Sequence, residues 1–213
     1  MLLSLGNSKI GKNLIRTASF GLQAGKTCPG AKDCLGSCFA MAGNYIFKNV
    51  IQKQNERLDA SNQLDFVGVI NAELKALRVG AVRVHDSGDY HSEEYLDKWI
   101  EIARQNPSVI FYSYTKSVHF FKSDKDTWKK ELPSNMVITF SYGGKYDHLI
   151  NRSTDKHALV FQSLEQLLEF GYQDTSEFDD NAYNKDIKLV GLIAKKHRKK
   201  EQWGQVLTQT MGG

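Results

Sequence analysis

From residue 81 onward, segments typical of buried strands alternate with segments typical of amphipathic helices. Residues 81–85, AVRVH, have the β-branched character of a buried strand, and Ser92 is a good N-cap for the helix that follows. Further strands are expected at 109–114, 136–142, 158–161 and 187–194, with helices at 124–132 and 163–170. This alternation predicts a parallel sheet, because each helix returns the chain to the start of the next strand.

The segment before residue 81 adds the beginning of the same pattern. A strand is expected at 14–20 and a helix at about 39–57, and a second helix face is traced by Leu64, Val67, Ile70, Leu74 and Leu77. About six βα units are too few for a closed eight-stranded barrel. The sequence therefore predicts a single α/β domain over 1–213, built on a partial (βα)6 TIM-like barrel or an open parallel sheet. In both, function gathers at the carboxyl ends of the strands.

All three cysteines lie in one short segment, CPGAKDCLGSC, which contains Cys28, Cys34 and Cys38. Thiolates group in this way when they share a metal ion or an iron–sulfur cluster. A structural zinc site needs four ligands, and the nearest histidine in sequence is His85. Three thiolates instead suit a [4Fe–4S] cluster with one iron open to a further ligand. Inert buried thiols and redox chemistry are the alternatives.

Three polar segments follow predicted strands and are expected at the same edge of the sheet as the cysteine segment. They are HDSGDYH at 85–91, YTKS at 114–117 and SYGGK at 141–145. The candidate catalytic residues are His85, Asp86, His91 and Lys116, and the candidate ligand-binding residues are Ser87, Gly88, Asp89, Gly143 and Gly144. Each has a structural alternative, because Asp and Gly also build ordinary turns and helix caps.

The net charge of +4 arises from one short run near the C-terminus. The chain has 28 Lys and Arg against 24 Asp and Glu, and the run contains Lys195, Lys196, Arg198, Lys199 and Lys200. Without these five residues, acidic side chains outnumber basic ones by one. The run is a candidate for binding nucleic acid or another anion, although a solvated helix end has the same composition.

The sequence contains no apolar run long enough to cross a membrane, and its N-terminus lacks the basic and apolar regions of a signal peptide. An odd number of cysteines also argues against a disulfide framework. These features predict a cytoplasmic protein.

The cysteine segment CPGAKDCLGSCFA resembles the bacteriophage family called gene product 88. The same resemblance extends to GNSKIGKN near the N-terminus, to VRVHDSGDYHSEEYLDKW and to YTKS, and covers about residues 4–145. The family name conveys no substrate.

The layout of these motifs is also similar to that of radical S-adenosylmethionine enzymes. That resemblance implies a partial barrel, with Cys28, Cys34 and Cys38 as ligands of a [4Fe–4S] cluster. It also implies that Ser87, Gly88 and Asp89 bind the amino group of S-adenosylmethionine and that Gly143 and Gly144 face the cofactor. The cysteine spacing, C-x₅-C-x₃-C, departs from the usual C-x₃-C-x₂-C, which weakens the expected chemistry more than the expected cluster.

Two functions are therefore expected. The first is an iron–sulfur enzyme of the radical S-adenosylmethionine type that acts on a nucleotide, a nucleic acid or a host protein. The second is a non-catalytic phage protein that binds host protein or nucleic acid and whose cysteines are structural or hold zinc.

Overall fold

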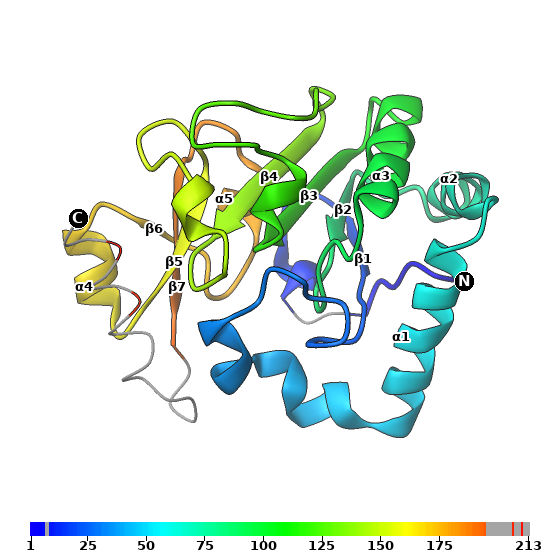
Figure 1. Ribbon diagram of the computed structural model, residues 1–213. Coiled ribbons are helices and arrows are strands. Elements are labelled where there is room, and N and C mark those ends of the chain that lie inside the picture. The colour runs from blue at the N-terminus through cyan, green and yellow to red at the C-terminus, as the bar shows by residue number, and fades with distance from the viewer. Residues whose placement is uncertain (7–8, 195–205, 207–209, 211–213) are drawn as a thin grey trace.

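Seven strands form one open, curled sheet in which every pairing is parallel (Figure 1). The computed structural model describes residues 1–6, 9–194, 206 and 210. The strand order is β1-β2-β3-β4-β5-β7-β6. The strands are β1 (Thr17–Phe20), β2 (Ala81–Val84), β3 (Ile110–Thr115), β4 (Met136–Ser141), β5 (His157–Phe161), β6 (Gln173–Asp174) and β7 (Leu189–Ile193). The predicted fold class is confirmed: a single α/β domain holds a half-barrel.

The convex face of the sheet carries the main apolar core. On β2, Val82 and Val84 belong to this core, which also contains Phe20 and Phe111 on the neighbouring strands. The helices that pack here are α2 (Phe66–Leu77) and α3 (Glu93–Gln105), with α1 (Lys48–Ser61) beside them and α4 (Leu164–Glu169) at the other end of the sheet (Figure 1). Ser92 caps α3 as predicted, since its hydroxyl oxygen accepts the backbone N–H of Tyr95 at 3.2 Å.

The predicted helix at 124–132 is wrong. Residues 121–133 form turns, because the carboxylate of Asp124 accepts the backbone N–H groups of Asp126 and Thr127, each at 2.9 Å. Such local bonds compete with helical ones. The buried ammonium of Lys122 also anchors this segment, because it lies 2.5 Å from the Asp155 carboxylate and 5.5 Å from the centroid of the Trp128 ring.

Two other expectations near the N-terminus need correction. Residues 39–46 form short 3₁₀ turns, and the α-helix begins only at Lys48, because Gly43 takes a left-handed φ of 61° that interrupts a helix. Leu64 is 99% exposed and precedes α2, so it is outside the apolar helix face. No helix in the described part of the chain is both long and apolar enough to cross a membrane.

The concave face of the sheet holds a buried cluster of charges. Asp179 is wholly buried and lies 2.7 Å from the ammonium of Lys9 and 2.6 Å from the guanidinium of Arg83 on β2. The hydroxyl of Tyr112 donates to the same carboxylate at 3.1 Å, and the Asp179 backbone N–H donates to Asn13. The cluster thus joins the N-terminal segment and the loop before α5 (Asp180–Tyr183) across the sheet.

Replacing Asp179 by Asn is expected to lower the free energy of unfolding by about 3 kcal/mol or more, because two buried cations lose their shared counter-charge. Chemical denaturation measures this. The matched control is Glu177→Gln, whose carboxylate lies 3.8 Å from Lys12 with both side chains exposed, and which is expected to cost less than about 0.5 kcal/mol. Equal losses in the two variants would contradict the role given to the cluster.

Candidate functional site

The cysteine loop, residues 28–38, lies over the carboxyl ends of β3 and β4 and is joined to them by backbone contacts. Ala31 forms an antiparallel bridge with Gly144, and the Lys145 N–H donates to the Gly30 carbonyl at 2.8 Å. The Cys34 N–H points to the Gly143 carbonyl at 3.4 Å. The segment after β4, which was expected to face the site, thus contacts the loop directly.

Two glycines allow the loop to approach so closely. A Cβ atom at Gly30 would overlap the backbone carbonyl of Lys116, which follows β3. At Gly88, with a left-handed φ of 78°, a Cβ would lie 2.6 Å from both Leu22 and Thr27 in the segment leading to the first cysteine. These contacts bring the segments after β2 and β3 against the cysteine loop.

The three thiols are half-buried, are not joined by disulfides, and lie close enough to influence one another. Burial raises the pKa of the Cys28 thiol to about 12, and the carboxylate of Asp89 and the two other thiols act in the same direction. Burial also raises the pKa of Cys34, although the nearby ammonium of Lys116 opposes the shift. Both thiols are therefore protonated at neutral pH, which argues against a reactive redox cysteine, whose pKa is depressed.

The donor set suits a soft metal centre. Three thiols from one loop share one electrostatic environment, with a lysine ammonium close to Cys34 to balance the charge that thiolates would bring. As they stand, however, no three His, Cys, Asp or Glu side chains among the described residues are placed to hold one metal ion. Binding would therefore require the loop to tighten and the thiols to lose their protons.

The site is stabilised by hydrogen bonds of Ser87 and Asp89 inside the protein and by the close packing of Gly88. Ser87 donates its hydroxyl to the Leu22 carbonyl at 2.8 Å. The buried Asp89 carboxylate accepts three hydrogen bonds, from the Tyr90 N–H at 2.8 Å, the Thr115 hydroxyl at 2.6 Å and the Lys116 N–H at 2.8 Å. Burial raises the pKa of Asp89 against the effect of these donors.

Lys116, Gly143 and Gly144 form a second set of internal bonds. The Lys116 ammonium donates to the hydroxyl and carbonyl of Ser141, at 2.8 and 2.9 Å, and to the Tyr142 carbonyl. The amides of Gly143 and Gly144 donate to Asp147 at 2.7 and 3.0 Å. Sequence reasoning missed Asp147, because an acidic residue after a glycine turn carries no distinguishing signal.

The two candidate histidines pack against Tyr95 of α3. His85 is buried, and its Nε2 atom is 3.0 Å from the Tyr95 hydroxyl. Burial lowers the pKa of His85 to about 3, so the ring is neutral. His91 stacks on Tyr95 with ring centroids 4.3 Å apart, and its Nε2 atom is 3.1 Å from the Ser61 hydroxyl. In this structure both rings contact the protein interior.

Asp86 is the residue of this segment that connects the loop to the concave face. It is partly exposed, and the Ser19 hydroxyl of β1 donates to it at 3.4 Å. Tyr45 lies close enough to Asp86, Arg83 and Cys38 for their charges to affect its pKa, which burial raises to about 12. Polar groups therefore extend from the cysteine loop to the buried charge cluster, a connection that the sequence did not reveal.

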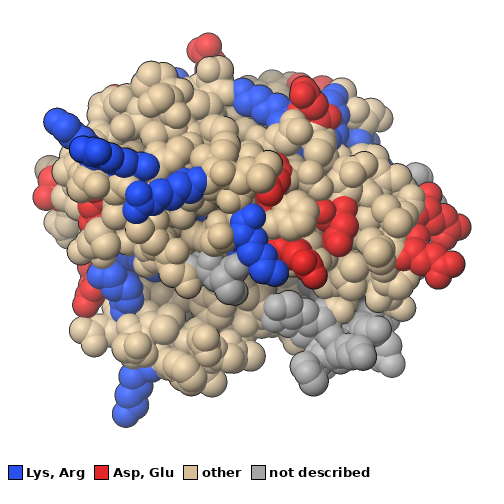
Figure 2. Space-filling view, turned by 180° about the vertical axis from the view of Figure 1, so that it is seen from behind, with Lys and Arg blue, Asp and Glu red and all other residues tan. Residues whose placement is uncertain are grey.

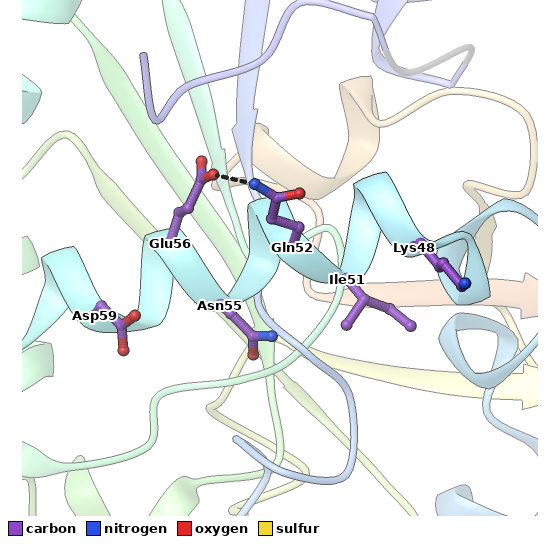
Figure 3. A pocket seen from close by; sticks show the side chains of 6 residues that line it. All are labelled: Lys48, Ile51, Gln52, Asn55, Glu56 and Asp59. Carbon is purple, nitrogen blue, oxygen red and sulfur yellow. Dashed lines mark hydrogen bonds between the residues drawn. The ribbon is translucent and has the colours of Figure 1, made fainter.

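A hollow of about 430 Å³ lies along the outer surface of α1 (Figure 3). It is lined by Lys48, Ile51, Gln52, Asn55, Glu56 and Asp59, and Gln52 donates to Glu56 at 3.2 Å within it. Because all its lining residues come from a single helix, it is a surface groove that encloses no ligand, and it contains none of the predicted site residues.

The family model of Gene product 88 matches residues 1–208. The chain belongs to the Gene product 88 family. The match includes the cysteine loop, the three polar segments and also the C-terminal third, beyond the 4–145 region in which the resemblance was expected. No curated protein and no solved structure matches the chain. The basic run at 195–200 lies outside the described residues, so its predicted role stays a prediction.

In this Gene product 88 family member, replacing Gly30 by Ala is expected to loosen the cysteine loop, because the added methyl group would overlap the Lys116 carbonyl. Overpacking of this kind costs about 1–3 kcal/mol, so thiol labelling by a disulfide reagent is expected to accelerate about tenfold. Gly11→Ala is the control, since nothing lies within 4 Å of a Cβ at that position. Unchanged labelling in Gly30→Ala would show that the close approach does not hold the loop.

His85 is expected to destabilise the protein at acidic pH. Its pKa is lowered to about 3 in the folded state, so as pH falls below about 6.5 the unfolded chain takes up a proton that the folded chain does not. Stability is then lost by about 1.4 kcal/mol per pH unit through this group. Asn tolerates the left-handed φ of 71° found here, so His85→Asn is the suitable variant.

Denaturation of wild type and His85→Asn between pH 6.5 and 4 measures the effect. As the pH falls, the free energy of unfolding of the wild type is expected to decrease more steeply than that of His85→Asn. A constant difference in stability between the two proteins does not affect this comparison. Parallel pH profiles would contradict the buried neutral ring.

Proposed function

We propose that the cysteine loop holds a [4Fe–4S] cluster through Cys28, Cys34 and Cys38, and that the protein is an enzyme of the radical S-adenosylmethionine type in the infected host's cytoplasm. The observation that supports this proposal is the position of three mutually interacting thiols in one loop over the carboxyl edge of a half-barrel. This edge is where parallel α/β sheets place their chemistry.

Residues around the loop would stabilise the bound state. The Lys116 ammonium already favours the thiolate of Cys34, and its bonds to Ser141 and Tyr142 fix its position. When bound, the cluster would supply the electron for reductive cleavage of S-adenosylmethionine. The protein's part is to exclude water and to keep the thiols together.

The segment after β2 would serve the cofactor in two ways. Ser87 and Asp89, whose bonds are internal, would fix the walls of the site, and Gly88 would keep the loop close. Asp86, which is partly exposed, would offer a carboxylate for an amino group, and the backbone of Gly143 and Gly144 would face the cofactor. The proposed substrate is a nucleotide, a nucleic acid or a host protein.

Anaerobic reconstitution with iron and sulfide tests the proposal. Wild-type protein is expected to bind about four irons per chain with the broad visible absorption of a cluster, and each single Cys→Ala variant is expected to lose most of it. Ser37→Ala is the matched control within the loop, because its buried hydroxyl has no hydrogen-bond partner among the described residues. A colourless, iron-free wild type would refute the cluster.

The second candidate is a non-catalytic phage protein that binds host protein or nucleic acid. The observation that favours its form with structural cysteines is that Cys28 and Cys34 are protonated and that no three potential ligands among the described residues are arranged around one point. Stoichiometric zinc, with unfolding on its removal, would support this alternative. So would salt-dependent nucleic-acid affinity that is lost when the five basic residues of 195–200 are neutralised.

A further inference from the structure

Residues 35–47, which include the last cysteine, form a stretch without charged side chains that has many exposed apolar ones. No Asp, Glu, Lys, Arg or His occurs in these thirteen positions. Five large apolar residues are between 37% and 57% exposed: Leu35, Phe39, Met41, Ile46 and Phe47. We call these five side chains the apolar patch.

The apolar patch comes from one run of consecutive 3₁₀ turns, at 33–37, 39–41 and 43–46. Leu35 and Met41 both approach Gly25, where a Cβ atom would lie 3.9 and 2.6 Å from their terminal carbons. Phe39 packs edge-on against Tyr45 with ring centroids 5.5 Å apart, and Ile46 and Phe47 follow directly. Seen from behind, most of the Lys, Arg, Asp and Glu side chains lie in the upper part and on the two sides of the molecule (Figure 2).

The size of the patch suits a stable interface. Large apolar side chains offer roughly 150–250 Å² each, so the exposed fractions amount to roughly 350–600 Å². A standard interface buries about 800 Å² on each partner, of which about 60% is apolar. The largest apolar patch of a typical monomer is about 300–600 Å² and is often functional, so a patch of this size is a candidate contact site.

We propose that the apolar patch is the centre of a two-fold interface between two copies of this chain. In such an interface each residue faces the same surface of its partner, so charges of one sign near the axis would repel. A patch without any charge avoids this repulsion, and its Phe, Met and Leu content is typical of homodimer interfaces. A nucleic acid would require cations here, and residues 35–47 contain none.

The contact would also lie beside the candidate site, because Cys34 directly precedes Leu35 and Cys38 directly precedes Phe39. Dimerisation would therefore reduce access of solvent to both thiols. The inference goes beyond the proposed function and does not depend on it, so metal-free protein is sufficient for the test.

Sedimentation equilibrium under reducing conditions measures the association. Wild-type protein is expected to sediment as a dimer at about 10 μM, and Phe47→Asp and Ile46→Lys are each expected to weaken association at least about tenfold. Phe47 is the N-cap of α1 and its carbonyl accepts the N–H groups of Val50 and Ile51. Asp is a favoured N-cap, so Phe47→Asp should keep or raise the helix stability.

Leu64→Asp is the matched control, because Leu64 is 99% exposed and lies outside the apolar patch, and it is expected to leave association unchanged. A monomeric wild type at about 100 μM would overturn the proposal. So would a dimer that persists in both patch variants, or one that Leu64→Asp weakens equally. A monomer that binds single-stranded oligonucleotides through Phe39 and Phe47 would assign the patch to a different partner.

Discussion

A single buried carboxylate, Asp89, connects the parts of the molecule on which the candidate site depends. It accepts hydrogen bonds from residues at the ends of β2 and β3 and thereby fixes the backbone of Lys116. The Lys116 carbonyl is the surface against which Gly30 packs, and the Lys116 side chain holds the end of β4. A buried carboxylate is costly without donors, and three of them make this one tolerable. The cysteine loop is supported by this chain of contacts.

The sequence predicted the fold well because its signals are local and periodic. Six strands and the cap at Ser92 appear as the patterns of β-branched and apolar residues indicated. The helix expected at 124–132 does not form, because the Asp124 carboxylate accepts the N–H groups of Asp126 and Thr127 in a turn. The spacing of apolar residues gives no sign of such a turn. The two-residue strand β6 is too short to leave a pattern of its own.

The sequence predicted where the cysteine loop and the polar segments meet, but it did not predict the hydrogen bonds and ion pairs that their side chains form. Parallel strands had to bring the cysteine loop and the polar segments to one edge, and they do. The hydrogen bonds that the buried Asp89 accepts depend on contacts between segments distant in sequence. So does the ion pair between Lys9 and Asp179, which are 170 positions apart. Pattern reasoning has no access to such contacts.

The three thiols form the proposed metal site, and the burial of Cys28 makes the metal affinity of this site dependent on pH. Because the pKa of Cys28 is raised to about 12, a metal must displace a firmly held proton, and affinity should fall as the solution becomes more acidic. Mössbauer spectroscopy of the reconstituted protein, with and without S-adenosylmethionine, tests the claim most directly. One iron is expected to differ from the other three and to change when the cofactor is added. Four equivalent irons, indifferent to the cofactor, would contradict it.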